Sequence, residues 1–338
     1  MVRTPLCHQL GIEYPIFSVG MGALAGPSLA AAVSNAGACG VLGRVSGAPA
    51  SDLRLRIQHL RTLTDKPFGV NVIIANPQEE LIEVCLEGRI PLLVLFWGDP
   101  APYVREAHRR GIKVFIQIGS VEEAVAAADA GVDAIIAQGL EAGGHVKSTT
   151  ALSTLLPEVV EAVQPVPVLA AGGIATGRGL VAALSLGAQA VSLGTRFLCS
   201  EEANTTPEYK ARVVESTAKD TLYTRLFNIG WDAPHRVLRN RAVSEWEAAG
   251  CPPPGHRPGE GSIIGTVPRG DTTGDTTLEL VRYSSRSYPL PGFRGDMEYS
   301  VLYAGESCSL IHDVKPAAQI VRDLVREADE AMEQMLRR

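Results

Sequence analysis

The sequence lacks any run of about 20 apolar residues, the length that a helix needs to cross a bilayer. It also lacks an apolar signal segment behind its first residues, Met1 to Pro5. The formal net charge is only −6, and the basic residues are scattered instead of forming the stripe that binds a nucleic-acid backbone. We therefore expect a cytoplasmic protein that binds neither membranes nor nucleic acid.

Cysteine is sparse, and its spacing is not that of a metal site. The six cysteines lie far apart, with no C-x-x-C pair and no histidine at metal-ligand spacing. We expect buried free thiols and no bound metal. Aromatic residues are also few, at 5%, but a total hydrophobic content of 46% is enough for a large aliphatic core.

Short apolar runs alternate with Ala-rich stretches of helical period along the first two thirds of the chain. This pattern is typical of βα units that feed a parallel sheet, whose strands are apolar on both faces. Glycines suited to helix ends follow five of the helical stretches, at Gly37, Gly88, Gly111, Gly131 and Gly187. The eight predicted strands are residues 15–19, 39–42, 68–73, 92–96, 113–117, 134–138, 166–170 and 190–193. Eight such units predict a (β/α)₈ TIM barrel, an α/β fold.

The βα rhythm stops after residue 212, and residues 250–296 are rich in proline, glycine, threonine and aspartate. Apolar periodicity returns at residues 301–311 and in a helix over 317–336. We therefore predict a barrel over residues 1–212, a small and mainly helical lid over 213–298, and a C-terminal segment over 299–338 that returns to the barrel.

Glycine-rich loops follow the last two predicted strands. Gly172 and Gly173 come after the seventh strand, and Gly194 and Thr195 come after the eighth. Active sites of this fold lie at the C-terminal ends of the strands, and the loops after strands seven and eight recurrently bind phosphate. Backbone N–H groups at glycine and at a helix N-terminus suit an anion. These loops therefore predict a phosphate site, and tight βα turns are the alternative.

The other strand ends predict a place for a flat ring. Gly20, Met21 and Gly22 follow the first strand in a G-x-G-x-x-A pattern. That pattern resembles a dinucleotide fingerprint, but no acidic residue ends the second strand, so we interpret it as backbone that lies against a ring. Amides that can hydrogen-bond a flavin stand in or at the end of three strands, at Asn71, Gln117 and Gln138. A satisfied core amide is the alternative for each of them.

His145 is the strongest candidate for proton transfer. Gly143 and Gly144 precede it in the loop after the sixth strand, so its backbone is unhindered at the mouth of the barrel. Imidazole titrates near neutral pH and is the side chain that most often acts as a general base or acid. A loop histidine that donates to a carbonyl is the alternative. The other histidines, His235 among them, lack such surroundings.

Two stretches together resemble the nitronate monooxygenase family, formerly called 2-nitropropane dioxygenases, and its flavin-dependent relatives. The first runs from Gln138 to His145, and the second runs from Pro167 to Ile174 and continues at Gly194 to Phe197. The likeness covers roughly residues 12–203 and 301–330. It implies an FMN-dependent oxidoreductase that oxidises alkyl nitronates with O₂ to a carbonyl compound and nitrite.

The resemblance also implies roles for the residues above. His145 matches the family's catalytic base. The phosphate of FMN would lie on Gly172, Gly173, Gly194 and Thr195, and the ring and ribityl chain would lie among the remaining candidates, namely Gly20, Met21, Gly22, Asn71, Gln117, Gln138, Gly143 and Gly144.

Two other functions remain open. One is an NAD(P)H-dependent flavin reductase of quinones or enoyl thioesters, such as an enoyl-acyl-carrier-protein reductase. The other is an isomerase or synthase of sugar phosphates that uses the same barrel without flavin. The partners that we expect are a small-molecule substrate and either O₂ or NAD(P)H, and the sequence is compatible with a homodimer.

Overall fold

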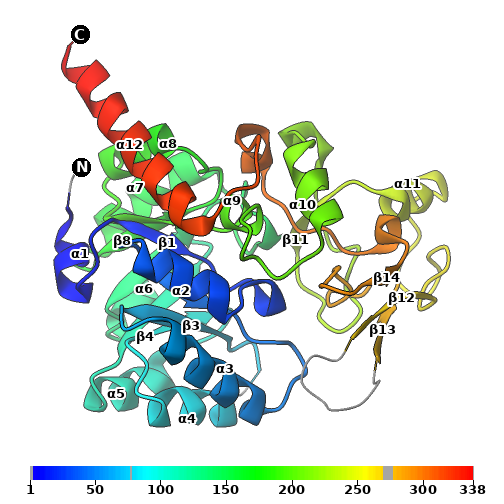
Figure 1. Cartoon of the computed structure of the whole chain (residues 1–338), viewed down its shortest axis with the longest axis horizontal. Coiled ribbons are helices and arrows are strands. Elements are labelled where there is room, and N and C mark those ends of the chain that lie inside the picture. The colour runs from blue at the N-terminus through cyan, green and yellow to red at the C-terminus, as the bar shows by residue number, and fades with distance from the viewer. Residues whose placement is uncertain (1–2, 77, 269–276, 338) are drawn as a thin grey trace.

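The chain folds as a (β/α)₈ barrel with an insertion before its last helix (Figure 1). The computed structural model describes residues 3–76, 78–268 and 277–337. Eight parallel strands form one sheet in the order β1-β9-β8-β6-β5-β4-β3-β2. A parallel bridge between Phe17 and Cys39 joins β1 to β2, so the two edges of the sheet meet and the barrel closes. The strands are β1 (Ile16–Ser18), β2 (Gly40–Leu42), β3 (Phe68–Ile73), β4 (Leu92–Phe96), β5 (Lys113–Ile118), β6 (Ala134–Gln138), β8 (Val168–Ala171) and β9 (Ala190–Leu193).

All eight predicted strands are confirmed, four of them (β3, β4, β6 and β9) with the predicted bounds. Apolar side chains cover both faces of the sheet, which is why the strands have nearly continuous apolar sequences. Phe115, Leu169 and Val94 belong to the cluster inside the barrel, where they pack with Leu6 and Cys7 of α1 (Pro5–Leu10). The helix α1 therefore contributes to the inner core.

Helices cover the outside of the barrel. They are α2 (Pro27–Asn35), α3 (Ala50–Leu63), α4 (Glu79–Glu87), α5 (Ala101–Arg109), α6 (Val121–Asp129), α7 (Leu152–Ala162), α8 (Gly177–Ser185) and the C-terminal α12 (Ala317–Leu336). The helix α12 packs against α8, and its Glu327 carboxylate accepts a hydrogen bond from the Gly177 N–H at 2.9 Å. The chain therefore returns to the barrel after the insertion. Among the described residues, no helix is long and apolar enough to span a bilayer.

Four of the five glycines predicted at helix ends have a positive φ, as such a position requires. The exception is Gly88, whose φ of −66° is helical, and the left-handed residue after α4 is Arg89 with a φ of 43°. The turn therefore comes one residue later than the glycine indicates.

The prediction of a mainly helical insertion is wrong. Within 213–298, the described residues form the last two residues of a helix that begins at Pro207, one helix of two turns, α11 (Arg241–Ala248), and short 3₁₀ turns. The other regular elements are strands. Residues branched at Cβ favour strands over helices, and four of the six residues of Ile263–Pro268 are of this kind. The strands are β10 (Thr221–Thr224), β11 (His235–Leu238), β12 (Ile263–Pro268), β13 (Thr277–Val281) and β14 (Arg294–Gly295).

The insertion is joined to the barrel by a shared sheet. The short strand β7 (Gly144–His145), in the loop after β6, pairs antiparallel with β11, and β11 pairs with β10. The helix α10 (Pro207–Val214) crosses the boundary expected at residue 212. The division into residues 1–212, 213–298 and 299–338 stays a prediction, and residues 269–276 of the insertion lie outside the described residues.

Candidate active site

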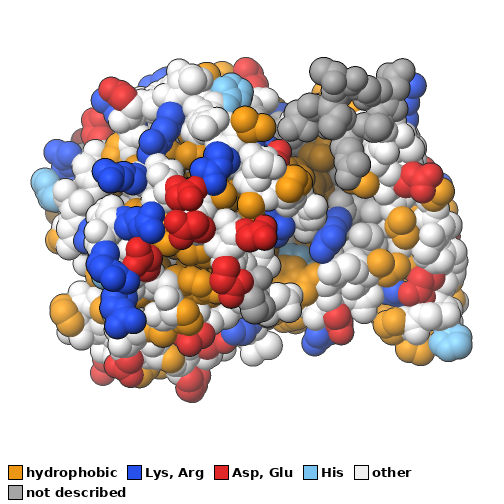
Figure 2. Space-filling model, turned by 90° about the horizontal axis from the view of Figure 1, so that it is seen from below, with side chains coloured by type: hydrophobic (Ala, Val, Ile, Leu, Met, Phe, Trp, Pro, Cys, Tyr) orange, Lys and Arg blue, Asp and Glu red, His pale blue; other side chains and the backbone are white. Residues whose placement is uncertain are grey.

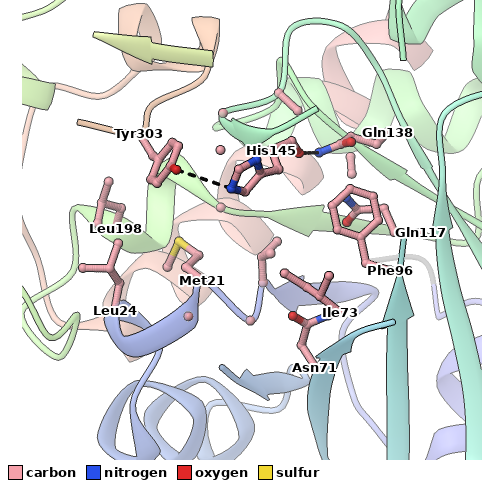
Figure 3. A pocket seen from close by; sticks show the side chains of 18 of the residues that line it. Met21, Leu24, Asn71, Ile73, Phe96, Gln117, Gln138, His145, Leu198 and Tyr303 are labelled. Carbon is pink, nitrogen blue, oxygen red and sulfur yellow. Dashed lines mark hydrogen bonds between the residues drawn. The ribbon is translucent and has the colours of Figure 1, made fainter. Parts of the chain in front are cut away.

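A cavity of about 310 Å³ opens at the C-terminal ends of the barrel strands, on the side of the insertion. Figure 2 shows the hollow between the larger barrel and the smaller insertion. Every residue that the sequence predicts for the site lines this cavity: Gly20, Met21, Gly22, Asn71, Gln117, Gln138, Gly143, Gly144, His145, Gly172, Gly173, Gly194 and Thr195. These residues come from the loops or ends of six strands, and the barrel brings them together (Figure 3).

The glycines of the cavity leave space that a side chain would fill. A Cβ on Gly20 would stand 2.3 Å from the Cβ of Asn71, so only glycine fits there. Gly172 and Gly173 have φ values of 108° and 69°, a region that favours glycine. Gly194 has an ordinary φ of −93°. Backbone N–H groups are therefore accessible at the ends of β8 and β9, as an anion site requires.

Thr195 begins the four-residue helix α9 (Thr195–Leu198), and its hydroxyl already has a partner. Its Oγ1 accepts a hydrogen bond from the Gly305 N–H at 3.0 Å. A Cβ on Gly143 would stand 2.3 Å from the same Gly305 nitrogen. The chain that returns from the insertion is therefore packed against the loops after β6 and β9, and it closes one side of the cavity.

His145 lies in β7 and faces the cavity (Figure 3). Its Nε2 lies 3.4 Å from the hydroxyl of Tyr303, and its Nδ1 is buried without a hydrogen-bond partner among the described residues. The Tyr303 hydroxyl donates to the Ser285 carbonyl at 2.9 Å. The Tyr303 oxygen is thus free to accept a hydrogen bond from a proton on Nε2.

A second histidine stands opposite His145 in the shared sheet. His235 pairs with His145 across β11 and β7, and their ring centroids are 5.7 Å apart. The Nε2 of His235 accepts from the Phe227 N–H at 3.2 Å, and its Nδ1 donates to the Ala233 carbonyl at 2.9 Å. Both ring nitrogens are satisfied in the neutral form, so His235 is a structural neighbour of the site. Its place beside the site is a finding of the structure, because the sequence around His235 does not indicate it.

Burial keeps both histidines neutral. Burial, and then the neighbouring His235, lower the pKa of His145 to about 3, although the Pro234 carbonyl acts in the opposite direction. Burial also lowers the pKa of His235 to about 4. At neutral pH the His145 imidazole is therefore unprotonated and can accept a proton.

The two shifts predict that the protein loses stability in mild acid. Below pH 6.5 the unfolded chain binds a proton at each of the two histidines. The folded chain binds a proton at His235 only near pH 4 and at His145 only near pH 3. The free energy of unfolding should therefore fall as the pH falls from about 6.5 to 4.5, and these groups should have no effect above pH 7. Urea unfolding at pH 8, 6.5, 5.5 and 4.5 measures this. The His145→Gln variant should show a shallower fall, and equal slopes for both proteins would contradict the assignment.

Aromatic rings surround His145. Trp231 lies at a centroid distance of 4.0 Å and Tyr303 at 5.5 Å, and Trp97 lies edge-on at 6.4 Å. Trp97 follows β4 directly and has a φ of 64°, a conformation that is uncommon for a bulky residue. Strained backbone of this kind clusters at functional sites. The rings exclude water from the imidazole, which accounts for its low pKa.

The three predicted amides have different surroundings. The Gln138 side chain is 4% exposed, and its Nε2 donates to the His145 carbonyl at 3.0 Å while its Oε1 accepts from the Lys147 N–H at 3.4 Å. Gln138 therefore positions the strand that carries His145. Asn71 donates to the Val94 carbonyl at 3.1 Å, which leaves its oxygen available. The Gln117 side chain lines the cavity and has no hydrogen-bond partner among the described residues.

Replacing Gln138 with Leu should lower the free energy of unfolding by about 1–3 kcal/mol, because two buried backbone groups lose their partner. It should also lower turnover, since β7 is no longer held. Urea unfolding and steady-state kinetics measure the two effects. Gln117→Leu is the matched control, because it removes the same amide without breaking a described hydrogen bond. Equal stability of the two variants would show that Gln138 does not hold β7.

Several residues of the site are not evident from the sequence. Tyr303 and Trp231 reach the cavity from the return segment and the insertion, as do Arg286 and Tyr288. The insertion contains no recognised motif, so nothing in the sequence marks these aromatic residues as part of a site. Trp97 could have been noticed, because it directly follows a predicted strand.

The prediction for the cysteines is correct for five of the six, which are buried free thiols, whereas Cys251 is exposed. Cys251 lies in the proline-rich part of the insertion, outside the barrel core. Within residues 3–76, 78–268 and 277–337, no group of three or more His, Cys, Asp or Glu side chains could hold a metal ion.

Comparison with protein families gives a match to the nitronate monooxygenase family over residues 3–327. Among curated proteins, the nitronate monooxygenase of Paraburkholderia phytofirmans is 30% identical over an alignment of 384 positions, which covers 98% of this chain and 97% of that protein. The (3aS,4S,5R,7aS)-5-hydroxy-7a-methyl-1-oxo-octahydro-1H-indene-4-carboxyl-CoA dehydrogenase of Rhodococcus jostii is 36% identical over 250 residues, which cover 74% of this chain and 69% of that protein.

Solved structures give two kinds of relative. FabK from Thermotoga maritima superposes with a TM-score of 0.80 and 34% identity, covering 99% of both chains. Nitroalkane oxidase from Streptomyces ansochromogenes superposes with a TM-score of 0.77 and 27% identity, covering 98% of this chain and 99% of that one. Both similarities extend over the barrel and the insertion.

Proposed function

The chain belongs to the nitronate monooxygenase family of flavin-dependent oxidoreductases, and from this membership we propose that it binds FMN and oxidises small alkyl nitronates with O₂. The products are a carbonyl compound and nitrite. The observation that carries the proposal is a neutral imidazole, His145, that faces a cavity lined by glycine loops at the ends of the strands.

The residues present fit FMN. Gly172 and Gly173 at the end of β8, with Gly194 and Thr195 at the end of β9, would hold the phosphate through backbone N–H groups. The ring and ribityl chain would contact Gly20, Met21, Gly22, Asn71, Gln117, Gln138, Gly143 and Gly144, which line the same cavity. When bound, the flavin would supply the redox chemistry between the substrate and O₂.

His145 acts as the catalytic base through Nε2. Its Nδ1 is buried, whereas its Nε2 is directed to the Tyr303 oxygen. The Tyr303 hydroxyl donates its hydrogen to the Ser285 carbonyl. Its oxygen can therefore accept a hydrogen bond from the protonated Nε2, which stabilises the proton on that nitrogen. With a neutral nitroalkane as substrate, the imidazole takes the carbon-bound proton. A nitronate has already lost that proton, and the imidazole then positions the anion.

A second function is favoured by the similarity to FabK over 99% of the chain. In that case the protein is an NAD(P)H-dependent flavin reductase of enoyl thioesters or quinones, and the similarity to a carboxyl-CoA dehydrogenase supports a thioester. His145 would then donate a proton to the reduced product.

An anaerobic titration of the FMN-loaded protein separates the two functions. Propionate 3-nitronate is added to one sample, NADH or NADPH is added to the others, and the visible flavin absorbance is followed. Reduction by nitronate alone supports the proposal. Rapid bleaching by NADH or NADPH, with nitronate inert, would replace it with the reductase.

A further inference from the structure

Two arginines line the active-site cavity, and the reaction proposed above has no use for them. Arg44 follows β2, and Arg286 comes from the insertion between β13 and β14. The loop from Arg44 to Ala48 brings them together. The Nη2 of Arg44 lies 3.5 Å from the Ala48 carbonyl, and the Nη1 of Arg286 lies 3.5 Å from the place where a Cβ on Gly47 would stand.

A third arginine adds to the positive charge of this rim. Arg56 on α3 donates its Nη2 to the Gly43 carbonyl at 3.2 Å, directly before Arg44 in the chain. The Nε atoms of Arg44 and Arg56 are buried and have no hydrogen-bond partner among the described residues. Asp52 interacts electrostatically with both of them and offsets part of their charge.

The like charges oppose each other in the protein as it stands. Burial, and then the charge of Arg286, lower the pKa of Arg44 from its ordinary value. Arg44 and Arg286 repel each other at the cavity, and an anion bound between them would relieve that repulsion. Guanidinium forks fit phosphate oxygens in pairs and are among the strongest phosphate ligands that a protein has.

This rim is separate from the glycine loops assigned to the phosphate of FMN. Those loops follow β8 and β9, whereas Arg44 follows β2, and β1 lies between β9 and β2 in the barrel. A small nitronate carries no phosphate. The arginines therefore indicate a larger ligand that enters between the barrel and the insertion, where the molecule is hollowed (Figure 2).

We propose that Arg44 and Arg286 form a subsite for the phosphomonoester of a nucleotide-bearing substrate or co-substrate. Two sources share this chemistry, the ribose 2′-phosphate of NADPH and the ribose 3′-phosphate of a coenzyme A thioester. The subsite does not depend on nitronate oxidation, since it requires only that the cavity is the active site.

Isothermal titration calorimetry of the FMN-loaded protein tests the subsite directly. The probes are 2′,5′-ADP for the first source, 3′,5′-ADP for the second, and 5′-AMP as the ligand that lacks the extra phosphate. We expect one bisphosphate to bind about 10- to 100-fold more tightly than 5′-AMP, as two charge-assisted contacts allow. Equal affinities for all three would overturn the proposal.

Arg286→Gln and Arg44→Gln should each reduce that preference. Arg286 is exposed, so its variant should fold even if Arg44→Gln does not. Arg105→Gln on the outer helix α5 removes an equal charge away from the cavity and should bind as the unmodified protein does. A preference that survives in both cavity variants, or loss of FMN from them, would overturn the proposal. The experiment uses no nitronate, so its result can be interpreted even if the protein does not oxidise nitronates.

Discussion

His145→Ala is expected to lower kcat for a neutral nitroalkane by about 10²- to 10⁴-fold, the contribution of a positioned general base. The variant loses the Nε2 that accepts the proton and the contact to Tyr303. FMN should stay bound, because the predicted phosphate contacts come from other loops. Steady-state oxygen consumption and the flavin spectrum of the purified variant measure the two quantities.

The same variant should be affected much less when the substrate is the preformed nitronate, because no proton remains to be removed from carbon. Tyr303→Phe is the matched control: it keeps the ring packed against His145 but removes the oxygen that would hold the transferred proton. It should lie between the unmodified protein and His145→Ala. Unchanged nitroalkane turnover in His145→Ala would remove His145 from the role of base.

Gly173→Asp is expected to weaken FMN binding by about a hundredfold or more. Gly173 is exposed at the end of β8 and has a φ of 69°, and an aspartate there would bring a negative charge to the predicted phosphate site. Two like charges at about 4 Å repel each other by several kcal/mol near a protein surface, and 1.4 kcal/mol is a tenfold change in affinity. Fluorescence titration of the apoprotein with FMN measures the dissociation constant.

Gly173→Asn separates charge from backbone strain. Asparagine has nearly the same shape as aspartate and tolerates a left-handed backbone equally well, but it is neutral. It should therefore retain much more FMN than Gly173→Asp. A Cβ at this position would meet only the Glu141 side chain at 3.6 Å, so neither variant should unfold the barrel. Full FMN occupancy in Gly173→Asp would show that the phosphate lies elsewhere.

The barrel could be predicted from the sequence because each of its strands has a recognisable local pattern. A strand buried on both faces must be apolar at every position, so the runs Phe68–Ile73 and Ala134–Gln138 are recognisable without a structure. The glycines after β1, β6, β8 and β9 could be read for a related reason. The fold places the end of every strand at one mouth, so residues far apart in sequence are certain to meet there.

The insertion could not be read in this way, because its composition allowed a helix as well as a strand. Its short strands form only through pairing with distant partners, as β11 pairs with β7 of the barrel. The same pairing places His235 opposite His145, and no sequence pattern predicts that the two residues are neighbours. Gln138 shows the opposite case. The sequence predicts that it faces the ring, but in the structure its amide is hydrogen-bonded to the backbone of His145 in β7 and of Lys147 just after it.

The sequence by itself thus determined the barrel, the mouth at which the site lies, and His145 as the candidate base, since periodicity and strand ends are local properties. The tertiary structure alone decided the state of that base. The low pKa of His145 follows from its burial, and its contact to Tyr303 joins two distant segments. The charged rim likewise joins Arg44 and Arg286, which lie 242 positions apart in the chain. Desolvation and charge proximity depend on distances in space, and the order of the residues does not contain those distances until the chain has folded.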